Sequence, residues 1–250
     1  MAIVKYSATK LQSIGKNGIL KPDENGYYDL VIGGLNAINS AGELYTLEGA
    51  KELFDRSSIF MRRISNGAVK SEVGHPKRLS GMTDDEFLHR IIRIEETNVC
   101  AHISDIWLNE SFGRDNPRLG RPNLVAIMGK VAPAGPKGDA LAKALENKKE
   151  NVMFSIRALT QDNMIRSVNH RVLKAIFTFD WVTEPGIDIA NKWDAPALES
   201  LDNMYITKAI VDAARNSNSP IAMENSKEVI NEISSFFDVN KDKKLNSYKW

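Results

Sequence analysis

Short runs of apolar and β-branched residues recur along the chain, bounded by glycine, proline or asparagine, and this pattern predicts strands. No internal repeat or low-complexity block interrupts the alternation of strand-like and helical segments. The pattern therefore predicts an α+β fold with a β-barrel-like core of about six to seven strands, surrounded by several helices. The strand-like runs are 28–32, 58–64, 99–108, 123–131, 152–159 and 172–182.

Other stretches predict helices. Thr83 and Glu86 form the capping-box pattern, in which each side chain accepts a hydrogen bond from a first-turn amide, so we expect a helix from Thr83 to about Ile94. Residues 139–149 are alanine-rich with leucines one turn apart, which is typical of a short amphipathic helix. Residues 197–214 also have apolar side chains at helical spacing, so a further helix is predicted there.

The chain divides into one principal domain, 1–220, and a C-terminal tail, 221–250. Residues 216–220 have the composition of a linker. The tail is rich in lysine, asparagine and serine around one amphipathic segment, 229–237, so it is predicted to be detachable.

The composition sets limits on partners and location. The 250 residues include 33 basic and 32 acidic side chains, with no long run of one charge, so neither nucleic acid nor an anionic membrane is indicated as a partner. The only cysteine, Cys100, excludes an internal disulfide, lies in an apolar run and is expected to be a packed core residue. No stretch approaches the ~18 apolar residues of a membrane span, so we expect a soluble intracellular protein.

One serine stands out when the strand-like run 152–159 is read as extended chain. Ser155 and Arg157 then project from one face, because side chains alternate along a strand. A half-buried strand with a polar face turned to solvent would give the same pattern. Among the four histidines, His75 lies between Gly74 and Pro76, which fix the backbone on both sides of the imidazole. This setting suits a catalytic base, and it also suits an ordinary turn.

A metal-dependent site is the other chemistry that the histidines allow. His75 and His102 are candidate ligands, but no close histidine spacing or cysteine cluster supports a site. His102 lies in a strand-like run and is expected to be structural. Asp238 begins a sequence like that of a calcium-binding loop, but lysines occupy the positions that need glycine and glutamate. We therefore predict no metal and no cofactor.

Several short motifs between about residues 70 and 190 occur in an order that resembles one family. The chain is similar to the prohead maturation proteases of tailed phages, particularly the T4-like prohead core protease group, which is related in fold to the herpesvirus maturation protease. A short leucine-containing helix before the serine strand is part of the resemblance. The motifs are EVGHP at 72–76, AHISDIW at 101–107, GKV at 129–131, PKG at 136–138, VMFSIRA at 152–158 and FDWVTEP at 179–185.

The resemblance implies a serine endopeptidase in which Ser155 is the nucleophile and His75 is the general base. A third group must orient the imidazole, and Asp180 on a predicted strand is our first choice. Glu72 competes, because the family pattern also has an acid three residues before the histidine. Positions three apart in a strand face opposite sides, so Glu72 needs a bulge or a turn to reach His75.

The resemblance also implies residues around the scissile bond. Gly186 and Ile187 lie in a loop that is expected to supply an oxyanion-hole amide, and Arg157 is expected to hold that loop or attract an acidic substrate side chain. Phage enzymes of this group resemble one another in cutting after glutamate, which predicts self-cleavage after Glu224 and release of 225–250.

The expected substrates are scaffold and capsid precursor proteins, processed inside the prohead in the cytoplasm of the infected bacterium. The resemblance is also compatible with self-association. Two alternatives stay open: a non-catalytic scaffold or capsid-associated protein that keeps the fold, and a metal-dependent hydrolase built on His75 and His102.

Overall fold

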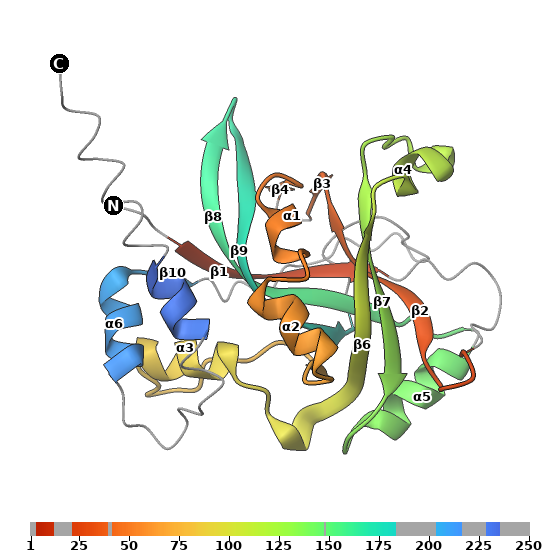
Figure 1. Cartoon of the computed structure of the whole chain (residues 1–250), viewed down its shortest axis with the longest axis horizontal. Coiled ribbons are helices and arrows are strands. Elements are labelled where there is room, and N and C mark those ends of the chain that lie inside the picture. The colour runs from red at the N-terminus through yellow and green to blue at the C-terminus, as the bar shows by residue number, and fades with distance from the viewer. Residues whose placement is uncertain are drawn as a thin grey trace.

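The computed structural model describes residues 4–12, 22–39, 42–147, 149–183, 204–216 and 229–235. The strands form two sheets, and the helices lie around them (Figure 1). The first sheet contains, in spatial order, β10 (Met204–Ile206), β1 (Val4–Gln12), β8 (Met153–Ile165), β9 (Val168–Val182), β4 (Leu44–Tyr45) and β3 (Ala37–Ile38). The second contains β2 (Tyr28–Leu35), β7 (Val125–Pro133), β6 (Val99–Asn109) and β5 (Lys70–Glu72).

The long hairpin of β8 and β9 organises the first sheet. Arg166 and Ser167 connect the two strands with positive φ values of 48° and 65°, the backbone of a tight hairpin turn. Antiparallel pairing places Ser155 opposite Asp180. The hairpin extends well beyond the body of the molecule in Figure 1.

In the described part of the chain, an isolated backbone bridge links the two sheets near the end of β5. Val73 pairs in parallel with Trp181 of β9, and the Gly74 amide donates to the Trp181 carbonyl at 2.6 Å. The Thr178 hydroxyl donates to the Lys70 carbonyl at 2.6 Å, again linking β9 to β5. The predicted α+β class is confirmed, but the strand pairings described do not close a barrel.

The main hydrophobic core lies on one side of β8. Phe154, Ile156 and Ala158 belong to it, together with apolar residues of β2, β6, β7 and β9, while Leu159 belongs to a second cluster. The side-chain alternation expected for β8 is therefore present, and it turns Ser155 and Arg157 away from the main core. The helices α1 (Ala50–Leu53), α2 (Ile59–Ser65) and α5 (Gly138–Glu146) contribute to the main core.

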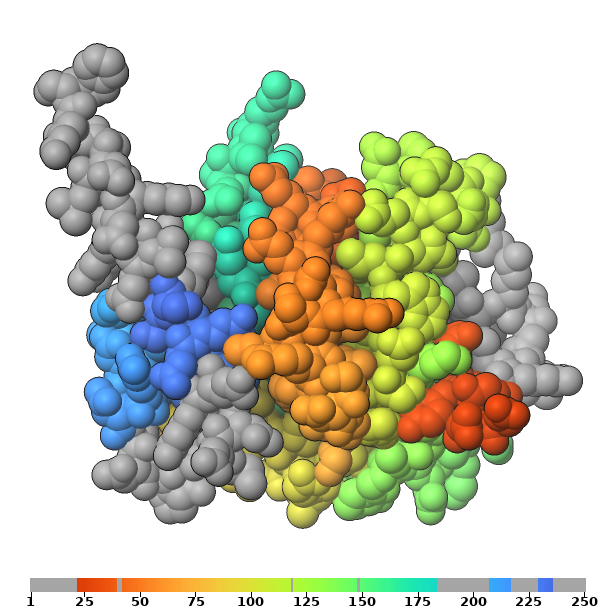
Figure 2. All heavy atoms as spheres, viewed as in Figure 1, coloured from red at the N-terminus to blue at the C-terminus, as the bar shows by residue number. Residues whose placement is uncertain are grey.

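The second cluster packs helices against the other side of the β8–β9 hairpin. It joins Leu159, Ala175 and Phe177 to apolar residues of α3 (Asp84–Ile92), α6 (Lys208–Asn216) and helix 229–235. Helix 229–235 and α6 adjoin one another on the surface in Figure 2. Val229, Ile230 and Ile233 are at most 5% exposed, so this part of the predicted tail is packed into the fold.

The remaining short helices are η1 (Glu96–Asn98), α4 (Phe112–Asp115) and η2 (Pro117–Leu119). A small third cluster packs Phe112 and Leu124 against β2 and β7. None of the helices in the described part of the chain has the length and apolar character of a membrane span.

Most predicted elements are present, including α3 with both capping-box hydrogen bonds, but two predictions are wrong. Residues 58–64 form helix α2 rather than a strand, because the Ser58 side chain caps the first turn and Phe60 and Ile64 are buried one turn apart. The helix predicted over 197–214 starts only at Lys208, because Met204–Ile206 pairs with β1 instead. Residues 197–203 lie outside the described part.

Candidate active site

The backbone around His75 is held on both sides. The Val73 amide donates to the Asn98 carbonyl at 3.1 Å, and Gly74 is bonded to Trp181. Gly74 has a φ of 72°, which a residue with a side chain adopts only at a cost, so glycine is needed where the chain turns out of β5. These contacts fix the position from which the imidazole reaches β8.

Ser155, His75 and Asp180 form one hydrogen-bonded line. His75 Nε2 lies 2.6 Å from Ser155 Oγ, and His75 Nδ1 lies 2.9 Å from Asp180 Oδ2. Ser155 and Asp180 have no exposed surface, and the His75 side chain is only 8% exposed. A hydroxyl, an imidazole and a carboxylate in this order match the arrangement of a nucleophile, its base and the group that orients the base.

Asp180 is ionised despite its burial. Burial by itself raises the pKa of this carboxyl, but the positive charge of Arg157 and the hydrogen bonds from His75 and Arg157 outweigh it, so the pKa is below its usual value. The backbone amide of Glu72 also donates to Asp180 Oδ1 at 3.3 Å. The carboxylate can therefore hold the Nδ1 proton of His75.

Comparison with known proteins places the chain in a peptidase family. The sequence profile of the Peptidase S80 family matches residues 6–236. The chain is 36% identical over 207 residues to the capsid maturation protease of Pseudomonas phage phiKZ, covering 81% of this chain and 74% of that protein. The chain belongs to the peptidase S80 family. The predicted resemblance to phage prohead maturation proteases is thereby confirmed.

A solved structure supports the fold of this S80 peptidase. The bacteriophage T4 capsid assembly protease superposes with a TM-score of 0.50 at 13% identity, covering 72% of this chain and 98% of that one. At this identity the match is a match of fold.

Arg157 has a different place from the one expected. Its side chain is fully buried, and Nε and Nη2 donate to the two oxygens of Asp180 at 2.8 and 2.6 Å. Nη1 donates to the Ile91 and Arg93 carbonyls at the end of α3, at 3.3 and 3.2 Å. The guanidinium therefore holds Asp180 from behind. Alternation along the strand predicted the face from which Arg157 projects, but it did not predict that Arg157 pairs with Asp180.

Glu72 does not bond to His75. Its fully buried carboxylate accepts two hydrogen bonds from Arg90, at 3.0 and 2.5 Å, and one from the Glu95 amide at 2.9 Å. It also forms an ion pair with Arg157 at 3.1 Å. Of the two candidate acids, only Asp180 reaches the imidazole. No local pattern marks the pair of Glu72 and Arg90, which is made by a helix returning over β5.

Two further candidate residues of the S80 peptidase, His102 and Cys100, lie in the described part of the chain. His102 is bonded to the Tyr27 hydroxyl at 2.8 Å and the Gly67 carbonyl at 3.0 Å, so both of its ring nitrogens take part in hydrogen bonds, as expected of a structural histidine. The described residues contain no group of three or more metal-ligating side chains. Cys100 is buried as predicted, and burial raises the pKa of its thiol to about 12. Gly186, Ile187 and Glu224 lie outside the described residues.

Proposed function

We propose that this S80 peptidase is a serine endopeptidase with Ser155 as nucleophile, His75 as general base and Asp180 as the group that orients the base. The observation that carries this proposal is the 2.6 Å contact between His75 Nε2 and Ser155 Oγ, with Asp180 on the other ring nitrogen. Hydrogen-bond reach between nucleophile and base is the first geometric requirement of such a site.

The chemistry follows from these positions. Ser155 Oγ attacks the peptide carbonyl while His75 Nε2 takes its proton, and His75 then gives the proton to the leaving amine. Water hydrolyses the resulting ester through the same base. Asp180 keeps the Nδ1 proton in place and stabilises the imidazolium that forms. We keep Gly186 and Ile187 as the source of an oxyanion-hole amide.

The natural substrates are proposed from the relatives. One is named as a capsid maturation protease and another as a capsid assembly protease, both of phages. We propose that this enzyme cuts scaffold and capsid precursor proteins during head maturation, inside the prohead in the host cytoplasm. Cleavage after glutamate remains part of the proposal, as does self-cleavage after Glu224, which would separate 225–250 from the rest of the chain.

Two alanine variants test the activity. Ser155→Ala and His75→Ala should each abolish cleavage of a glutamate-containing peptide and leave the circular dichroism spectrum unchanged. His102→Ala is the matched control, because it removes a histidine whose described hydrogen bonds are to Tyr27 and Gly67. Full activity of the Ser155 variant would overturn the serine mechanism. A wild-type enzyme inert on these peptides and on precursor shells would favour the non-catalytic scaffold, and loss of activity with a chelator would favour a metal hydrolase.

Self-cleavage is tested separately by mass spectrometry of the purified chain. We expect a product that ends at Glu224 in the wild type and an intact chain in Ser155→Ala. An intact chain in an enzyme that cuts peptides, or a shortened chain in the serine variant, would argue against self-processing.

A further inference from the structure

A line of alternating buried charges extends from Asp180 behind the proposed catalytic residues, and its other three members take no part in the proposed chemistry. Asp180 meets Arg157, Arg157 meets Glu72, and Glu72 meets Arg90. Arg90 is the only one of the four with an exposed side-chain fraction above zero, at 21%. Burying this many charges costs desolvation free energy unless every charge is paired, so we ask what role the arrangement has.

The pairing between Arg157 and Asp180 is bidentate. Two parallel hydrogen bonds from a planar guanidinium fix the plane of a carboxylate as well as its distance. Asp180 Oδ2, which also accepts from His75 Nδ1, is therefore held in one direction. A carboxylate without this clamp could rotate away from the imidazole.

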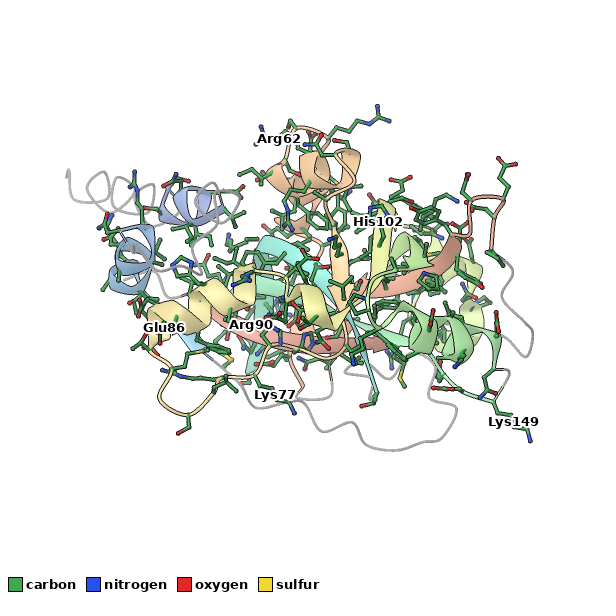
Figure 3. The ribbon with its side chains drawn as sticks, turned by 90° about the horizontal axis from the view of Figure 1, so that it is seen from below. Arg62, Lys77, Glu86, Arg90, His102 and Lys149 are labelled. Atoms are coloured by element: carbon green, nitrogen blue, oxygen red, sulfur yellow. The ribbon has the colours of Figure 1, made fainter. Side chains whose placement is uncertain are left out.

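Helix α3 holds the clamp from the far side. Arg157 Nη1 donates to carbonyls at the C-terminal end of α3, where unpaired carbonyls and the helix dipole favour a cation. Arg90 belongs to the same helix, where Figure 3 labels it, and donates to both oxygens of Glu72. The Arg157 guanidinium is thus enclosed by Asp180, Glu72 and the end of α3.

We propose that Arg157 is a positioning residue for catalysis, which fixes the Asp180 carboxylate against His75, and that Glu72 and Arg90 hold Arg157 in place. The proposal rests on the catalytic roles of Ser155, His75 and Asp180 given above. Among the described contacts of Arg157, Asp180 is the one with a proposed catalytic role, so we infer that Arg157 acts through Asp180.

Other titratable groups lie near this line of charges. Arg63 of α2 is buried and donates to the Phe177 carbonyl, and burial followed by the charge of Arg157 lowers its pKa. The Cys100 thiol of β6 is neutral, since burial raises its pKa to about 12. Neither group changes charge in the pH range in which a histidine base titrates.

The test measures kcat, KM and the pH profile of kcat/KM for three variants, with active sites counted by a fluorophosphonate. Arg157→Met should lower kcat per active site about 100-fold with KM little changed, because the orienting group is loosened. It should also move the low-pH fall of the kcat/KM profile, called the acid limb below, upward by about 1 pH unit. The reason is that losing a positive charge makes the Asp180–His75 pair easier to protonate. Arg157→Lys should leave the limb in place but lower kcat, because a lysine cannot fix the plane of a carboxylate.

Glu72→Gln should shift the acid limb in the opposite direction from Arg157→Met. It removes a negative charge and should move the limb to lower pH, so the limbs of the two variants should lie on either side of the wild-type limb. Arg171→Met is the matched control, because Arg171 is also a buried arginine in an ion pair, with Glu43, but lies about 30 Å along β9 from Asp180. It should lower the melting temperature and leave the acid limb unchanged.

Each outcome decides the proposal. Unchanged kcat per active site and an unchanged acid limb in Arg157→Met would overturn it, as would limb shifts of the same sign in Arg157→Met and Glu72→Gln. If Arg157→Met does not fold, Arg157→Lys and Glu72→Gln carry the test. Activity that survives Ser155→Ala would instead refute the catalytic roles themselves, so the two failures are distinguishable.

Discussion

Helix 229–235 is packed into the folded core, although it belongs to a segment with the composition of a tail. The perturbation is Ile230→Ala, because the Ile230 side chain is 0% exposed within the second cluster, beside α3 and α6. The experiment uses a Ser155→Ala background, so that self-cleavage cannot remove the helix.

The expected loss follows from the burial. Removing the apolar atoms of a fully buried isoleucine costs about 2–5 kcal/mol, including the cavity that is left. For a domain of this size 1 kcal/mol corresponds to about 2–4 °C, so a loss of ~3 kcal/mol lowers the melting temperature by about 6–12 °C. Thermal unfolding followed by circular dichroism measures it.

Ile165→Ala is the matched control, since Ile165 is 48% exposed at the end of the β8 strand. It should change stability by no more than about 0.5 kcal/mol. Equal melting temperatures for the Ile230 and Ile165 variants would refute the packing of helix 229–235. If the Ile230 variant melts at a lower temperature than the Ile165 variant, the proposed cut after Glu224 has one of two results. Helix 229–235 stays bound to the core without a covalent link, or it dissociates and the enzyme becomes less stable.

Three further outcomes are expected. Burial lowers the pKa of His89 below 6.5, and this is only partly offset by the nearby Ala214 backbone and by Asp85. The unfolded chain therefore binds this proton more readily, so the contribution to stability is full above about pH 6.5 and falls below it. In urea unfolding, the free energy of unfolding should fall less between pH 7.5 and pH 5.5 in His89→Leu than in the wild type; equal losses would contradict this. Cys100 should resist iodoacetamide until the protein unfolds, because its thiol is buried and its pKa is about 12; rapid alkylation at pH 7.5 would contradict this. Gly74→Ala should cost about 1–2 kcal/mol of stability and lower kcat, because the positive φ of Gly74 sets the position of His75; unchanged kinetics and melting would contradict this.

The parts of the site that depend on local pattern could be predicted. Alternation along β8 predicted that Ser155 and Arg157 share a face. The glycine and proline on either side of His75 predicted a fixed imidazole. The assignment of 58–64 failed because its β-branched and aromatic residues also fit a helix, and the Ser58 cap decided between the two.

The ion pairs behind the site could not be predicted from spacing. Glu72 follows a register shift in β5, so simple alternation does not give the direction of its side chain. Its partner Arg90 is 18 residues away in sequence and depends on how α3 returns over the strand. Interactions of this kind are set by tertiary packing, which a single sequence does not encode in any local period.

The complete burial of Ser155 has a consequence for when the enzyme works. Ser155, His75 and Asp180 already lie within hydrogen-bond reach of one another, yet a peptide carbonyl cannot touch Oγ while Ser155 has no exposed surface. The proposed mechanism therefore requires a movement that exposes Ser155 before cleavage begins.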